Sequence, residues 1–143
     1  MTDQPSALDA WESLFRAQVT VLRELQESFP SDQLSLNEYD VLFNLSRQPK
    51  QTVRLRDLNK LLLITQPSVS RLIDRLAARE LVRKEPDPGD GRGTLVSLTP
   101  EGESQFRKVA AVHSRAIQRR VGDALSADEL AELTRITTKL RRG

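Results

Sequence analysis

Residues 55–102 constrain the fold more than any other part of the chain, and they read LRDLNKLLLITQPSVSRLIDRLAARELVRKEPDPGDGRGTLVSLTPEG. Leucines recur at helical spacing through the first eight residues. Apolar side chains at residues 69–76 then follow the pattern i, i+3, i+4, i+7 of a second helix with one buried face. Thr65 can cap that helix, and Pro67 is tolerated in its first turn, where backbone N–H groups have no helical partner. The pattern predicts two short helices joined by a turn.

The second half of this segment predicts a β-hairpin followed by another helix. Residues 81–84 and 94–98 have the composition of strands, and residues 86–93 between them contain three Gly, two Pro and two Asp. We expect a long hairpin loop over 86–93 with Arg92 at its tip. A new helix starts at Thr99-Pro100-Glu101. This order of elements is that of a winged helix-turn-helix.

Helices are also predicted on both sides of this module. Near-heptad spacing of apolar residues predicts a long amphipathic helix over about 8–29, and a capping box at residues 35–38 begins another that ends near Arg47. A long basic helix follows residue 100, and a second capping box at residues 126–129 opens the last one. The fold class we expect is mainly α with a small β-hairpin wing.

Composition limits the class of protein. A chain of 143 residues with 38% hydrophobic and 29% charged residues predicts a single soluble domain, residues 1–143. No apolar run approaches the roughly 18 residues of a membrane span, and the N-terminus does not resemble a signal peptide, so we expect a cytoplasmic protein. With no Cys and one His, neither a disulfide framework nor a metal site is expected, and no cofactor is predicted.

Charge is distributed unevenly along the chain. Residues 1–40 carry a net charge of −6, whereas residues 41–143 carry +8. A basic field of this kind suits the neutralisation of phosphates, and it also suits a solvated helical surface. Charge alone therefore leaves both interpretations open.

The outward face of the predicted helix over 69–76 carries side chains that can read DNA. Arg71 can bind guanine through two hydrogen bonds, Ser68 and Ser70 can bond base edges or phosphates, and Arg75 can reach the backbone. The alternative is a solvated helix whose arginines pair with Asp74 and Glu80.

The glycine-rich hairpin offers a second group for DNA. Arg92 can enter a narrow minor groove, with its orientation held by Asp90. The alternative is an ordinary hairpin with a surface Asp–Arg pair. The position of the hairpin directly after a recognition-type helix favours DNA binding.

Four motifs, TQPSVSRLIDRL at 65–76, LVR at 81–83, DPGDGR at 87–92 and LVSLTPEG at 95–102, resemble the MarR family of bacterial and archaeal regulators. The resemblance implies a winged-helix homodimer that represses transcription, with residues 35–102 as its DNA-binding region. Three residues depart from the family pattern: Asn59, where Ala is frequent; Glu80, where Gly often ends the recognition helix; and Gly93, where another charged residue is common. A left-handed backbone at Glu80 would cost stability, and Gly93 would make the wing more mobile. The implied DNA-binding residues are Thr65, Gln66, Pro67, Ser68, Ser70, Arg71, Arg75, Asp90 and Arg92.

The terminal helices, about 8–29 and 104–141, present apolar seams that a single winged helix cannot easily bury. Packing against a second copy would bury both, and the family resemblance implies the same dimer, while an intramolecular bundle is the alternative. The expected dimerisation residues are Leu8, Trp11, Phe15, Leu130, Leu133, Ile136 and Leu140.

Family members often respond to a small aromatic or phenolic anion, for which this chain has candidate side chains. They are Trp11, Tyr39, Asp40, Phe43 and Arg47, and the alternative role for them is core packing with a surface ion pair. His113 is expected to be structural or to face solvent rather than to act as a ligand or catalyst.

The expected function is that of a cytoplasmic, nucleoid-associated regulator that binds a pseudo-palindromic operator in double-stranded DNA. A different class, a winged-helix protein-interaction module with an acidic partner, is the alternative. An enzyme is not expected, because no nucleophile, phosphate-binding loop or paired carboxylate stands in a recognisable motif.

Overall fold

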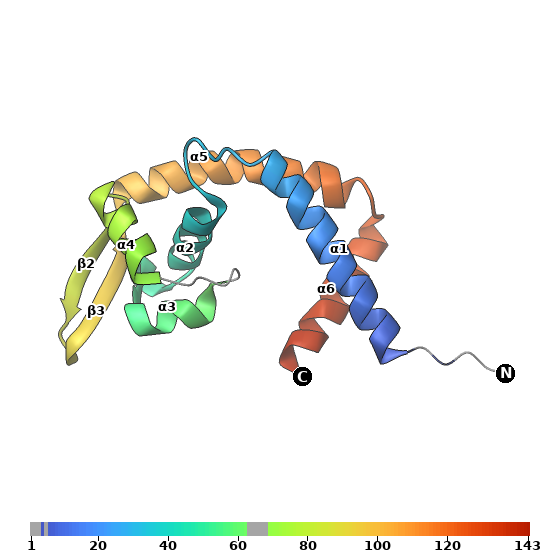
Figure 1. Cartoon of the computed structure of the whole chain (residues 1–143), viewed down its shortest axis with the longest axis horizontal. Helices are drawn as coiled ribbons and strands as arrows, with labels where there is room; N and C mark the ends of the chain where they lie inside the picture. The colour runs from blue at the N-terminus through green and yellow to red at the C-terminus, as the bar shows by residue number, and fades with distance from the viewer. Residues whose placement is uncertain (1–3, 5, 63–68) are drawn as a thin grey trace. The chain divides into compact units, whose positions relative to one another are not determined.

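The computed structural model describes residues 4, 6–62 and 69–143, which divide into two compact units. One unit contains residues 30–112, and the other contains residues 1–29 together with 113–143. Figure 1 follows the chain through helices α1 to α6 and the hairpin β2–β3.

Three helices supply most of the buried apolar side chains of the 30–112 unit: α2 (Leu36–Ser46), α3 (Leu55–Leu61) and α4 (Val69–Ala78). The predicted capping box at the start of α2 is present, with the Ser35 hydroxyl accepting from the Glu38 N–H and the Glu38 carboxylate accepting from the Ser35 N–H. Leu34, just before the cap, is 1% exposed. The apolar face predicted for α4 is buried, and its members are Val69, Leu72, Ile73 and Leu76.

A small antiparallel sheet of three strands, in the order β1-β3-β2, completes the winged helix. The hairpin strands β2 (Val82–Asp87) and β3 (Asp90–Leu98) were predicted, whereas β1 (Thr52–Arg54) and the 3-10 turn before it (Pro49–Gln51) were not. β1 pairs with the C-terminal half of β3, Val53 opposite Val96. Three residues are too few for periodicity to reveal a strand.

The hairpin is longer, and its turn tighter, than the predicted loop over 86–93. β2 continues to Asp87 and β3 begins at Asp90, so that only Pro88 and Gly89 connect them. Pro86 pairs with Thr94 and Asp87 with Asp90, and residues 91–93 of β3 therefore have no counterpart on β2. The expectation of a long loop was wrong. Turn-forming residues here build a tight turn and a bulge.

Helix α5 (Pro100–Ile117) starts where the sequence predicted, with proline at its first position. The Thr99 hydroxyl accepts from the Gly102 N–H at 2.9 Å and donates to the Glu80 carbonyl at 2.6 Å. Glu80 itself has φ +62°, the left-handed conformation considered for this position. The end of α4 and the start of α5 are thus tied together through Thr99.

The second unit contains α1 (Ala7–Glu27) and α6 (Ala127–Arg142), with a π-helical turn (Gln118–Gly122) between α5 and α6. The predicted capping box of Ser126 and Glu129 begins α6. Neither α1 nor α6 has a fully buried residue, and large apolar side chains of both helices are exposed: Leu8, Trp11, Phe15, Leu133, Ile136 and Leu140. Within the described ranges, no helix combines the length and apolarity needed to cross a membrane.

Candidate nucleic-acid interface

The exposed face of α4 is opposite its buried apolar residues. Ser70, Arg71 and Arg75 are all exposed, as the helical spacing predicted. The predicted residues Thr65, Gln66, Pro67 and Ser68 lie outside the described part of the chain. The described portion of the helix therefore presents a hydroxyl and two guanidinium groups to solvent.

Within the described part of the chain, no carboxylate neutralises the two arginines of α4. Asp74, on the same face, pairs with Lys84 of β2 at 2.6 Å. Arg71 and Arg75 make no ion pair with any other described residue. The alternative in which Asp74 and Glu80 neutralise these arginines is therefore not what the structure contains.

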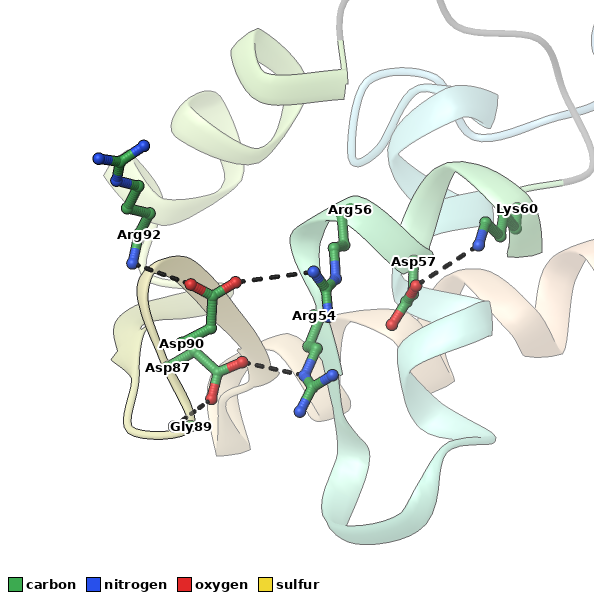
Figure 2. A network of polar contacts seen from close by, with 8 residues as sticks. All are labelled: Arg54, Arg56, Asp57, Lys60, Asp87, Gly89, Asp90 and Arg92. Carbon is green, nitrogen blue, oxygen red and sulfur yellow. Dashed lines mark hydrogen bonds and ion pairs between the residues drawn. The ribbon is translucent and has the colours of Figure 1, made fainter.

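Arg92 lies in the β3 bulge, two residues after the start of the strand rather than at the tip of a loop. Asp90 Oδ1 accepts a hydrogen bond from the Arg92 backbone N–H at 3.2 Å. In Figure 2 the Arg92 guanidinium points away from Asp90, Arg54 and Arg56. Asp90 thus holds the backbone of Arg92 and leaves its cationic head in solvent.

Two arginines that the sequence reasoning missed also belong to this region. Arg54 Nε lies 2.9 Å from Asp87 Oδ2, and Arg56 Nη1 lies 3.6 Å from Asp90 Oδ2 (Figure 2). The available signal was two arginines with one residue between them at a helix start, and two aspartates that flank a Pro-Gly turn. Their pairing depends on β1, which the sequence pattern did not reveal.

Four of the residues considered for a small ligand gather in the 30–112 unit. Tyr39 stacks on Phe43 and on Phe106, with centroid distances of 6.2 and 5.4 Å, and the Arg47 guanidinium lies 4.7 Å from the centre of the Phe43 ring. Burial raises the pKa of the Tyr39 phenol, with a smaller opposing effect of the Arg47 charge. Asp40 is buried and accepts a bond from Asn44 at 3.0 Å.

The remaining ligand candidate, Trp11, belongs to the other unit, where it packs against Phe15 at a centroid distance of 5.7 Å. Six of the seven expected dimerisation residues are exposed there, and Leu130 is half-buried. A groove of about 660 Å³ runs between α1 and α6, with Leu14, Val21 and Leu125 among its lining residues. Exposed apolar side chains are thus concentrated in this unit.

His113 lies in the same unit, where its ring meets Phe29 edge to face at a centroid distance of 5.1 Å. Burial lowers the pKa of the His113 imidazole. Across residues 4, 6–62 and 69–143, no three His, Asp or Glu side chains are grouped so that they could hold a metal ion.

Comparison with known proteins identifies relatives of this chain. The sequence profile of the MarR family matches residues 32–93. The multiple antibiotic resistance protein MarR of Salmonella typhimurium is 30% identical over 84 residues, which are 59% of this chain and 58% of that protein. The match therefore spans a little under three fifths of the length of that relative.

Solved structures extend the similarity to nearly the whole chain. Sco3205, a MarR family transcriptional regulator of Streptomyces coelicolor crystallised in complex with DNA, is 27% identical with a TM-score of 0.81, over 99% of this chain and 91% of that one. The structure of BpsR from Bordetella bronchiseptica, which describes regulation of its DNA binding by 6-hydroxynicotinic acid, is 28% identical with a TM-score of 0.79, over 93% and 98%. In its sequence profile over residues 32–93, in its relatives and in its winged-helix fold, this chain is similar to the MarR family.

Proposed function

We propose that this protein is a homodimeric transcriptional regulator that binds a specific inverted repeat in double-stranded DNA and represses the adjacent genes. One observation carries the proposal. Arg71 and Arg75 on α4 and Arg92 on the hairpin present guanidinium groups that make no ion pair with a described residue, although carboxylates lie close by. A cation on a helix can bind in the major groove of DNA, and a cation on a hairpin can bind in the minor groove.

The proposed roles follow from this arrangement. Arg71 binds a guanine in the major groove, Ser70 bonds a base edge or phosphate, and Arg75 binds the phosphate backbone. Arg92 enters the minor groove while Asp90 holds its backbone. At the start of α4 the proposed contacts are Thr65, Gln66, Pro67 and Ser68.

Dimerisation is proposed through the terminal helices, so that residues 1–143 act as one functional domain with two DNA-reading heads in the dimer. The support is the row of exposed apolar side chains in the unit that holds both termini, including Trp11, Ile136 and Leu140 at 58%, 48% and 59% exposure. Two heads about one helical turn of DNA apart would read an inverted repeat. Light scattering at micromolar concentration tests this, and a monomeric mass would refute it.

A small aromatic or phenolic anion is the proposed effector. The support is the aromatic group of Tyr39, Phe43 and Phe106 with the Arg47 cation beside it, together with the BpsR relative. Isothermal titration with 6-hydroxynicotinic acid and related hydroxybenzoates, each measured with and without Phe43→Ala, tests for binding at these rings. Equal affinity of both proteins would exclude this location.

A regulator of this kind has no enzymatic activity and works in the cytoplasm, associated with the nucleoid. The competing function is a winged-helix module with an acidic protein partner. Fluorescence anisotropy with double-stranded DNA over a salt series separates the two, because release of counterions gives a DNA binder a steep salt dependence.

Selection of bound fragments from sheared genomic DNA would then reveal the repeat and its neighbouring genes. Failure to enrich any sequence would refute the proposal.

A further inference from the structure

We infer that Arg54 and Arg56 are positioning residues for the wing, which together fix the β3 bulge so that Arg92 is presented to the minor groove. The inference rests on the proposed DNA-binding function and adds a structural cause for one of its two contacts. Its basis is a pair of ion pairs that join the turn of the hairpin to the segment around the start of α3.

The first pair joins β1 to the end of β2. The Asp87 side chain is only 6% exposed, and its Oδ2 lies 2.9 Å from Arg54 Nε. Its Oδ1 accepts from the Gly89 N–H at 2.9 Å, which closes the hairpin turn. A carboxylate with so little contact with water depends on its cationic partner. The Arg54 charge therefore holds the turn against the strand at the far edge of the sheet.

The second pair joins α3 to the start of β3. Asp90 has two partners: Oδ2 faces the Arg56 guanidinium at 3.6 Å, and Oδ1 accepts from the Arg92 N–H at 3.2 Å. Arg56 thus acts on the backbone of Arg92 through a single carboxylate. Asp90 is thus occupied by Arg56 and by an N–H group, and in Figure 2 the Arg92 guanidinium points away from it.

Gly93 fits the same arrangement through its lack of a side chain. A methyl group added there would lie 3.2 Å from the Asp87 Cβ and 3.3 Å from the Asp90 Oδ2. Nothing lies within 4 Å of the corresponding position at Gly91. The absence of a side chain at Gly93 lets the bulge pack close to the side chains of Asp87 and Asp90.

The inference predicts a specific loss of minor-groove readout. Without the two ion pairs the bulge has no fixed orientation, so Arg92 loses conformational entropy when it binds DNA. Arg92 then distinguishes narrow from wide minor grooves less well. A simple phosphate contact would behave differently, because its loss weakens binding to all duplexes equally and lowers the salt slope by about one ion. A general structural role would instead lower thermal stability.

The test uses the full chain and two duplexes that share one selected operator core but have A·T-rich or G·C-rich flanks. The measured quantity is the dissociation constant for the duplex with G·C-rich flanks divided by that for the duplex with A·T-rich flanks. We expect Arg54→Gln and Arg56→Gln each to reduce this ratio about fivefold. The loss of affinity caused by a base change in the operator core should stay the same. In an Arg92→Ala background neither variant should lower the ratio further. Gly93→Ala should lower the ratio as well.

Matched controls accompany each variant. Arg83→Gln removes a charge from the same hairpin, where Arg83 pairs with Glu85 at 3.0 Å, and Gly91→Ala adds a methyl group in open space; both should keep the ratio. Melting curves identify misfolded variants. If Arg54→Gln unfolds, Arg56→Gln carries the test, because its side chain is 63% exposed.

The outcomes separate the inference from the proposed function. If the unmodified protein enriches no DNA, the proposed function fails. If it binds DNA but its two flank affinities are equal, or if the glutamine variants keep the full ratio, DNA binding stands and the positioning role is refuted. Loss of affinity on both duplexes by the same factor would also overturn the inference, by making the arginines phosphate contacts.

Discussion

The ammonium group of Lys84 on β2 lies 2.6 Å from a carboxylate oxygen of Asp74 on α4. This contact decides the charge of the exposed face of α4. Arg71 lies three residues before Asp74, a spacing at which an Asp–Arg pair forms readily on a helix. Lys84 holds the carboxylate toward the hairpin and leaves Arg71 available.

We therefore expect Lys84→Gln to raise the dissociation constant for DNA about threefold beyond the effect of removing one surface charge. The additional loss arises because Asp74 is released to pair with Arg71. Adding Asp74→Asn should recover that part of the loss. Fluorescence anisotropy on the four proteins of the double-mutant cycle gives the coupling between the two sites. Additive effects of the two substitutions would show that Lys84 does not act through Asp74.

Removal of Arg71 and removal of Arg92 should change DNA binding in different ways. Arg71→Ala is expected to weaken binding by about 1–3 kcal/mol and to relax base preference at one position in each half-site, since it removes a bidentate contact to guanine. Arg92→Ala should weaken binding mainly on A·T-rich flanks. Selection from a randomised site measures both preferences.

Arg107→Gln is the control for these two variants, because Arg107 is an exposed arginine on α5 that pairs with Glu103 at 2.6 Å. It should keep the base preferences of the unmodified protein. An Arg71→Ala protein that selects an unchanged site would remove Arg71 from the recognition surface.

The elements predicted correctly from the sequence are those fixed by local chemistry. The helix α4 follows from its apolar spacing, and the capping boxes at Ser35 and Ser126 each involve residues three apart. These signals lie within one turn of helix, so a sequence pattern contains them completely. The family resemblance added the homodimer and the set of DNA-binding residues.

What the sequence pattern left out depends on contacts between distant segments. β1 is stabilised by its pairing with β3, more than forty residues later in the chain, and its three residues have no period of their own. One interpretation of the sequence paired Asp74 with the arginines of its own helix, but tertiary packing places Lys84 at 2.6 Å from it. The Arg54–Asp87 pair exists only because β1 and the hairpin belong to one sheet.

Replacing Glu80 by glycine should stabilise the protein by about 0.5–1 kcal/mol. Glu80 has φ +62°, a conformation that favours glycine, and its exposed side chain makes no ion pair with a described residue. Its carbonyl still accepts from Thr99 in the variant, because that bond involves only backbone at position 80. Thermal melting should show a higher midpoint for Glu80→Gly and no such gain for Glu80→Ala, which retains the strain. A lower midpoint for the glycine variant would contradict this account.

His113 should titrate below the ordinary histidine pKa of about 6.5 in the folded protein. Burial disfavours its charged form, and the ring meets Phe29 edge to face at 5.1 Å. Because the unfolded chain binds the proton more readily, the contribution of the neutral ring to stability is complete above about pH 6.5 and is lost as the pH falls through the folded pKa. The chain contains one histidine, so its ring resonance in a proton NMR titration is unambiguous. We expect a midpoint below 6.5 in buffer that returns to about 6.5 in concentrated urea; an equal or higher midpoint in the folded state would show that burial does not govern this residue.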